Sequence, residues 1–205
     1  MPVRPLPFFR ILSAACLCLS VLLAAGCSGK QVHVTTENEF NLMARRLPSI
    51  LRDRGLIDEH GAYYAPVFSV PELPPAVGEY LFRRLSPAFR FRVDPSLLPP
   101  TFAQSRTAGD TVEMRPYGFV LGQGADIVTV ELLAQADWND DGANEWLVLC
   151  RIKPLLGKDN MRDYYLLVDQ PGAAILVPKV IAVYDCLTRS CKLFMDVNEK
   201  KPPYA

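Results

Sequence analysis

The second half of the sequence constrains the fold most, because it consists of short segments with the composition of strands. From Tyr117 onward, runs rich in Val, Ile, Leu and Tyr alternate with gaps that carry Gly, Asp, Asn and Pro. Apolar runs bounded by turn residues predict β-strands. The predicted strands cover residues 117–121, 126–136, 145–153, 163–169, 174–185 and 191–196. Consecutive strands joined by short connections favour an antiparallel meander.

The preceding region is predicted to be helical and then rich in proline. One helical face would carry Phe40, Met43, Ala44, Leu47, Ile50 and Leu51. Thr36 and Glu39 fit a capping box at its start, and Pro48 is expected to kink or split the helix. A second short helix is predicted from Pro75 to about residue 85. We therefore predict an α+β fold, with N-terminal helices packed on an antiparallel β meander.

The first residues are excluded from this fold. The opening MPVRPLPFFR contains two arginines and no acid, and the apolar run ILSAACLCLSVLLAA follows it. A membrane-spanning helix needs about 20 apolar residues, so this run is short for one. A basic start, an apolar middle and an exit through small residues are typical of a secretory signal peptide.

The exit of this segment reads Leu23-Ala24-Ala25-Gly26-Cys27. It resembles the lipobox of bacterial lipoproteins, although the leucine lies one place further from the cysteine than is most common. The resemblance implies that Cys27 is lipidated, with palmitate among its acyl chains, and becomes the mature N-terminus in the lipid bilayer. Ser28 resembles the residue found in lipoproteins sorted to the outer membrane, where the host has two membranes.

The predicted organisation has three parts. Residues 1–26 form the lipoprotein signal peptide, and residues 27–35 form the lipidated cysteine and a tether. Residues 36–205 form a single α+β domain, with a helical and proline-rich part (36–116) and a β-rich part (117–205). The precursor has 22 basic and 22 acidic side chains, and removal of residues 1–27 takes away Arg4 and Arg10 but no acid, which leaves a net charge of −2. This balance argues against a nucleic-acid partner.

The stretch ADWNDDGANEW, residues 136–146, lies between two predicted strands. Asp137, Asn139 and Asp141 are two residues apart and Gly142 follows, as at the first positions of an EF-hand calcium loop. Ala143 would supply a backbone carbonyl, and Glu145 a further carboxylate. The pattern resembles EF-hand and FG-GAP-type calcium loops, which implies weak binding of a structural calcium ion.

Two features of this stretch depart from an EF-hand. Val148 stands where the bidentate glutamate would be, and the flanking segments are strands rather than helices. The alternatives are an acidic hairpin turn that uses Asn, Asp and Gly as turn formers, or a catalytic carboxylate cluster.

Three cysteines remain after the signal peptide is removed. Cys186 and Cys191 are separated by four residues between two predicted strands, so a hairpin would allow a disulfide in an oxidising compartment. Cys150 shares a strand face with Trp146, Val148 and Ile152, and we expect a buried thiol there.

The paired arginines at positions 45, 46, 83 and 84 suggest either a solvated surface or a basic face for anionic lipid. The sequence contains no complete catalytic constellation. We therefore expect a non-enzymatic envelope lipoprotein that binds a protein partner or supports an assembly. The alternatives are an envelope hydrolase that uses Asp137, Asp141 or Glu145, and a thiol–disulfide sensor.

Overall fold

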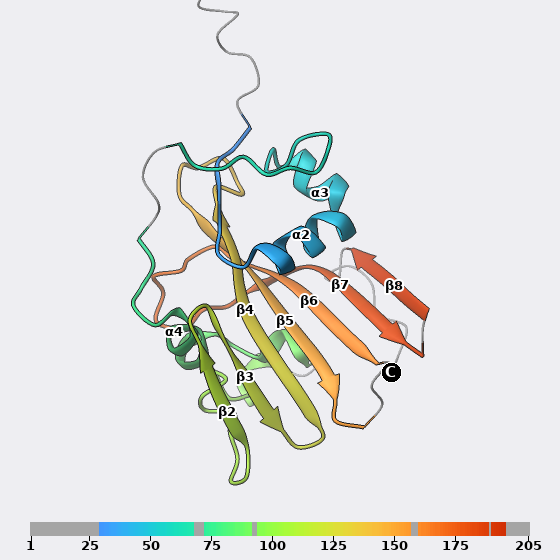
Figure 1. The fold of residues 1–205 in the computed structure, drawn as a ribbon. Helices are drawn as coiled ribbons and strands as arrows, with labels where there is room; N and C mark the ends of the chain where they lie inside the picture. The colour runs from blue at the N-terminus through green and yellow to red at the C-terminus, as the bar shows by residue number, and fades with distance from the viewer. Residues whose placement is uncertain (1–28, 68–71, 92–93, 157–159, 189, 196–205) are drawn as a thin grey trace, which may run out of the picture.

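A computed structural model of the protein describes residues 29–67, 72–91, 94–156, 160–188 and 190–195. Its main element is an eight-stranded antiparallel sheet (Figure 1). The strands are β1 (Val32–Val34), β2 (Thr111–Arg115), β3 (Gly118–Gln123), β4 (Asp126–Ala136), β5 (Glu145–Pro154), β6 (Met161–Val168), β7 (Lys179–Leu187) and β8 (Ser190–Met195). From β2 to β8, each strand pairs with the next one along the chain.

The first strand breaks this sequential order. β1 pairs with the last residues of β4, in the register Val32 opposite Ala136, while β3 pairs with β4 from Asp126 to Glu131. Because β5 occupies the other edge of β4 along its whole length, β1 and β3 share a single edge. A β-bulge between Leu132 and Ala134 separates the two pairings.

The predicted α+β class is wrong, because the protein is mainly β. Strands account for 41% of the structure and helices for 19%, and the described residues form three short α-helices. These are α2 (Glu37–Arg46), α3 (Pro48–Asp53) and α4 (Val77–Arg84). Between α4 and β2, the described residues form two single 3-10 turns, Ala88–Arg90 and Pro95–Leu97. The apolar residues of the proline-rich region therefore pack on the sheet, but the region does not form a helical layer.

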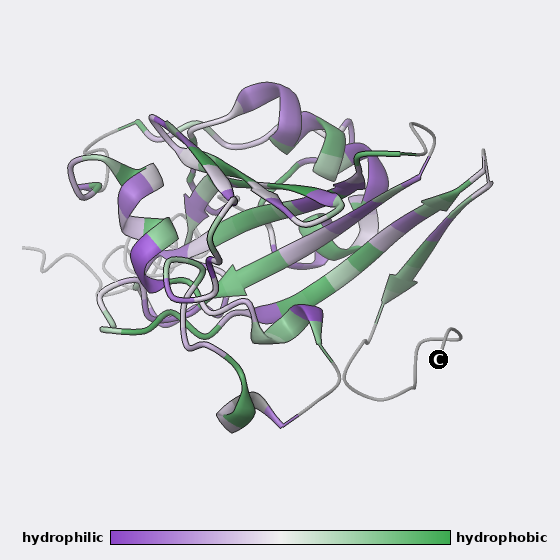
Figure 2. Ribbon diagram, turned by 90° about the horizontal axis from the view of Figure 1, so that it is seen from below, coloured by the Kyte–Doolittle hydropathy of each residue, from purple (hydrophilic) through white to green (hydrophobic). Residues whose placement is uncertain are grey.

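Both faces of the sheet are covered, and each has its own hydrophobic core. Helices α2 and α3 pack on one face, over residues such as Leu133, Leu149 and Tyr165. Helix α4 packs on the opposite face, where Phe82 and Phe119 stack edge to face with their ring centroids 5.2 Å apart. Figure 2 shows long hydrophobic stretches along the central strands. A sheet buried on both faces explains why these strands are apolar nearly throughout rather than alternating.

Pro48 splits the first helix, as its missing N–H and its ring require. The predicted capping box is not formed: Thr36 precedes α2, but its side chain makes no cap hydrogen bond. The hydroxyl of Thr36 donates instead to the carbonyl of Leu132 at 2.9 Å, and the N–H of Thr35 donates to the carbonyl of Leu133 at 2.9 Å. The bulge in β4 therefore provides the acceptors that hold the connection between β1 and α2.

Two strands lie where no strand was predicted. β1 occupies part of the predicted tether, and β2 lies at the end of the proline-rich region. β2 is an edge strand whose residues are mostly exposed. Its sequence TVEMR therefore lacks the apolar pattern that identifies a buried strand.

Candidate functional site

The acidic stretch forms the connection between β4 and β5. Asp140 and Gly142 have positive φ angles of 66° and 83°, which the Asn, Asp and Gly residues of the loop tolerate better than others. The carboxylate of Asp137 accepts hydrogen bonds from the N–H groups of Asp141 and Gly142, at 3.2 and 3.1 Å. Asp141 accepts one from the N–H of Ala143 at 2.8 Å. The side chains thus close the turn on their own backbone.

Glu145 lies at the base of this loop rather than on its surface. Its side chain is buried, and Oε2 accepts a 2.7 Å hydrogen bond from the N–H of Trp138. Burial raises the pKa of the Glu145 carboxyl, the bond from Trp138 lowers it, and the negative charges of Asp141 and Asp137 add to the increase. Trp138 is itself buried in the core under α2 and α3, so the pair fixes the loop to the domain.

The side chains of the proposed metal ligands lie in two places. Asp137, Asn139 and Asp141 surround the turn, whereas the Glu145 carboxylate points to the backbone of Trp138. Within the described residues, no group of three or more His, Cys, Asp or Glu side chains is arranged to hold a metal ion. Asn139 instead donates from Nδ2 to Asp141 at 3.0 Å, and its Oδ1 accepts from the N–H of Asp141 at 3.1 Å.

Most of the acidic loop is open to solvent. Residues 139–144 are all exposed. A small cavity of about 100 Å³ lies elsewhere, between β7 and β8, and is lined by Asp185, Leu187, Ser190, Lys192 and Phe194. Ligand pockets usually enclose several hundred cubic ångströms. The geometry at the acidic loop therefore gives no support to a hydrolase that encloses a polymer substrate.

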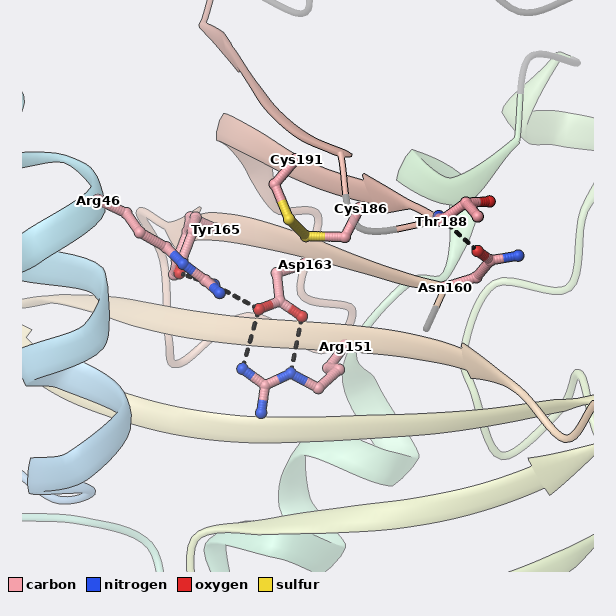
Figure 3. Close-up of a disulfide and its surroundings, with 8 residues drawn as sticks. All are labelled: Arg46, Arg151, Asn160, Asp163, Tyr165, Cys186, Thr188 and Cys191. Atoms are coloured by element: carbon pink, nitrogen blue, oxygen red, sulfur yellow. Dashed lines mark hydrogen bonds and ion pairs between the residues drawn. A yellow bond between two sulfur atoms is a disulfide. The ribbon is translucent and has the colours of Figure 1, made fainter. Parts of the chain in front are cut away.

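A buried ionic cluster, which the sequence analysis missed, joins α2 to the sheet (Figure 3). Asp163 on β6 is fully buried, and its carboxylate accepts hydrogen bonds from two arginines. Arg46 from α2 donates to its Oδ2 at 2.6 Å, and Arg151 from β5 donates to Oδ1 and Oδ2 at 2.8 and 2.9 Å. Arg151 also binds both carboxylate oxygens of Glu39 on α2, at 3.1 and 3.0 Å. We call Glu39, Arg46, Arg151, Asp163 and Tyr165 the buried ionic cluster.

The hydrogen bonds in this cluster keep its arginines charged. Burial alone would lower the pKa of Arg151, but hydrogen bonds to Asp163 and Glu39 outweigh it and raise the pKa. Burial would likewise lower the pKa of Arg46, and its bonds to Tyr165 and Asp163 raise it. Arg46 also lies over the ring of Tyr184, with its guanidinium carbon 3.7 Å from the ring centroid. The cluster is therefore a fully paired structural element with no free nucleophile or base.

One sequence signal pointed to this cluster. Asp163 is an acidic residue in the run MRDYYLLV, at an inward position of a buried strand. A buried carboxylate needs a charged partner, and Arg151 stands directly opposite it on β5. The contribution of Arg46 could not be inferred, because it comes from a helix 117 residues away in the sequence.

Two of the three described cysteines form a disulfide, and the third is a buried thiol. A disulfide joins Cys186 and Cys191 across β7 and β8, which is consistent with the predicted pairing. The loop-entropy model gives so small a ring about 2 kcal/mol of stabilisation. Cys150 is a fully buried thiol in the core under α4, and burial raises its pKa to about 12. At neutral pH it is therefore protonated and poorly nucleophilic.

The disulfide and the free thiol lie on opposite faces of the sheet. Cys150 packs on the α4 face together with Val183. Because side chains alternate along β7, Cys186 points to the face opposite to that of Val183. It shares this face with Tyr184, which packs against the core under α2 and α3. A sensor that exchanges disulfides among all three cysteines would require the sheet to open.

The four paired arginines do not form one basic face. Arg45 and Arg46 lie on α2, whereas Arg83 and Arg84 lie on α4, and these two helices cover opposite faces of the sheet. Arg46 belongs to the buried ionic cluster, and Arg83 forms an exposed ion pair with Glu79 at 2.8 Å. These arginines therefore do not form one surface that anionic lipid could contact.

Comparisons of the chain with protein-family models, with curated proteins and with solved structures found no match. Cys27 and the predicted signal peptide lie outside the described residues. Over the part of the chain that the structure describes, no helix is both long enough and apolar enough to span a membrane.

Proposed function

We propose that the protein is a bacterial envelope lipoprotein, held in a membrane by acyl chains on Cys27. The single observation that carries this proposal is the sequence LAAGC at the end of an apolar run with a basic start. Two or more acyl chains on one cysteine would give stable anchoring, since each buried methylene contributes about 0.8 kcal/mol. The disulfide between Cys186 and Cys191 supports an oxidising location outside the cytoplasm.

The proposed anchor predicts that Cys27→Ser abolishes lipid attachment. In cells supplied with labelled palmitate, the native protein is expected to incorporate label and to sediment with membranes. Cys27→Ser should lose both properties, because the hydroxyl cannot form the thioether. Cys18→Ala, within the apolar run of the signal, is the matched control and should behave like the native protein. Label and membrane association that persist in Cys27→Ser would contradict the anchor.

We propose a non-enzymatic role as a binding or assembly-support module for a protein partner of the envelope. Two observations support it: residues 139–144 of the acidic loop are exposed, and the titratable groups around Asp163 are paired with one another. Crosslinking of intact cells is expected to yield a discrete adduct that contains this protein and another chain. Recovery of the monomer alone, at crosslinker levels that trap known envelope complexes, would count against this role.

We also propose that the acidic loop binds calcium weakly and is stabilised by it. The support is the spacing of Asp137, Asn139 and Asp141 around the turn at Gly142. At a calcium concentration ten times the dissociation constant, one site adds about 1.4 kcal/mol, which corresponds to roughly 3–6 °C in melting temperature.

The measurement is a thermal melt in calcium and in chelator. The variant carries Asp137→Asn and Asp141→Asn, because asparagine retains a side-chain acceptor for the turn but removes the charge. We expect calcium to raise the melting temperature of the native protein and to have no effect on this variant. Superimposable melts of the native protein under the two conditions would show that the loop is a plain turn.

A further inference from the structure

The folded domain begins almost immediately after the proposed lipidation site. Gly29 lies against the ring of Tyr64, and a Cβ at this glycine would come within 2.0 Å of Cε2. The N–H of Lys30 donates to the carbonyl of Gly55 at 2.8 Å, and the N–H of Val32 donates to the carbonyl of Tyr64 at 2.7 Å. The chain is therefore fixed to the domain from its first described residues.

The side chain of Lys30 extends this attachment to the acidic loop. Its Nζ lies 2.8 Å from Oδ1 of Asp140 and 3.3 Å from the carbonyl of Trp138. The end of α3, the turn at residues 58–61 and the β4–β5 loop all lie at the same end of the molecule, the top of Figure 1. We call this surface the Lys30 end.

Covalent geometry limits how far this end can lie from Cys27. Each residue spans at most about 3.6 Å, so the Cα atoms of Cys27 and Gly29 are no more than about 7 Å apart. The β3–β4 turn lies at the other end of the sheet, together with the end of β5, the start of β6, the end of β7 and the start of β8. With eleven residues in β4, the two ends are about 35 Å apart.

We propose that the Lys30 end lies against the phospholipid headgroups of the membrane that holds Cys27, with the opposite end of the sheet directed away from it. This inference rests on the proposed lipidation. It assigns the acidic loop to the membrane-facing surface and leaves the exposed Leu155 and Leu156, just after β5, on the side open to other molecules.

The charges at this end match zwitterionic headgroups better than anionic ones. Its exposed charged side chains have both signs: Arg52, Asp53, Arg54, Glu59, Asp140 and Asp141. Acidic groups outnumber basic groups among them, so the surface has no net attraction for anionic lipid. Phosphatidylethanolamine presents an ammonium group and a phosphate, which pair with the carboxylates and with the arginines respectively. We therefore expect the covalent anchor, not surface charge, to hold the domain in place.

The test measures which end is near the lipid, on the full lipidated protein in phosphatidylethanolamine-rich vesicles. A fluorophore is attached to a single new cysteine, either His60→Cys at the Lys30 end or Ala125→Cys in the β3–β4 turn, both at exposed positions. Cys150 is buried and the other two cysteines are paired, so the reagent reaches the new cysteine. Quenching by lipid with a spin-labelled headgroup reports proximity to the membrane surface.

Quenching is expected to be at least threefold stronger at position 60 than at position 125. Insertion of twelve Gly and Ser residues between Ser28 and Gly29 should remove the difference, because such a linker spans about 20 Å on average. High salt should leave the quenching ratio unchanged.

Four outcomes would overturn the inference. Equal quenching at the two positions in protein that floats with the vesicles, or stronger quenching at position 125, would refute the orientation while leaving the anchor intact. If high salt abolished the difference in quenching between positions 60 and 125, the role of the short tether would be refuted. Protein that does not float with the vesicles would refute the anchor, and the orientation with it.

Discussion

Asp163→Ala is expected to destabilise the protein by about 3–5 kcal/mol, the largest effect of any single substitution considered. The carboxylate is fully buried between Arg46 and Arg151, with bonds of 2.6 to 2.9 Å. Removal of one partner leaves charged groups buried without compensation, which typically costs this much. Arg151 keeps its hydrogen bonds to Glu39, so Arg46 is the arginine left without a charged partner. Chemical denaturation followed by circular dichroism measures the change.

A matched control separates burial from charge pairing in this experiment. Glu79 and Arg83 on α4 also form an ion pair, at 2.8 Å, but both side chains are at least half exposed. Exposed pairs contribute little, so Glu79→Gln should change the unfolding free energy by no more than about 0.5 kcal/mol. If Asp163→Ala and Glu79→Gln shifted the denaturation midpoint equally, the buried ionic cluster would not have the structural role assigned to it.

Gly78→Ala is expected to destabilise the protein by about 2–3 kcal/mol, although alanine is the better helix former. A Cβ at Gly78 would lie 2.0 Å from the carbonyl oxygen of Gly118 and 2.2 Å from that of Arg115. Both oxygens belong to backbone at the hairpin between β2 and β3, so no side chain can move aside. Helix α4 would have to lift from the sheet and disturb the contact between Phe82 and Phe119.

Gly172→Ala is the control for Gly78→Ala. No atom lies within 4 Å of a Cβ built at Gly172, and its φ angle is not positive. Alanine there should leave stability unchanged or raise it by about 0.4–1 kcal/mol, through a less flexible unfolded chain. Equal denaturation midpoints for the two variants would contradict the close approach of α4 to the β2–β3 hairpin.

Much of the sheet could be predicted from sequence because its central strands are long and apolar. β4 and β5 lie within one residue of their predicted bounds, and the turn formers between them mark the connection. β1 and β2 were missed for physical reasons: one has three residues, and the other is an exposed edge without an apolar pattern. The class was misjudged because the helices are short and contribute little: strands account for 41% of the structure and helices for 19%. The apolar residues of the proline-rich segments, such as Phe102, pack on the sheet without forming a helix.

The candidate sites were predictable only where neighbours in the sequence determine them. The pairing of Cys186 with Cys191 follows from a hairpin, and the turn at Gly142 follows from local side-chain hydrogen bonds. The inward position of Glu145, which removes it from the surface of the loop, depends on how Trp138 packs. The buried ionic cluster depends on α2 lying over β5 and β6, a tertiary contact with no local pattern.

The shared edge of β4 has a consequence for the order of folding. Strands β2 to β8 pair through short connections, whereas β1 must find β4 roughly a hundred residues later in the chain. Closing so large a loop costs entropy before any contact offsets it, so local hairpins should form first. Helix α2 joins through contacts of similarly long range. We expect β1 and α2 to assemble last, so that the segment next to Cys27 attaches to a meander that is already formed.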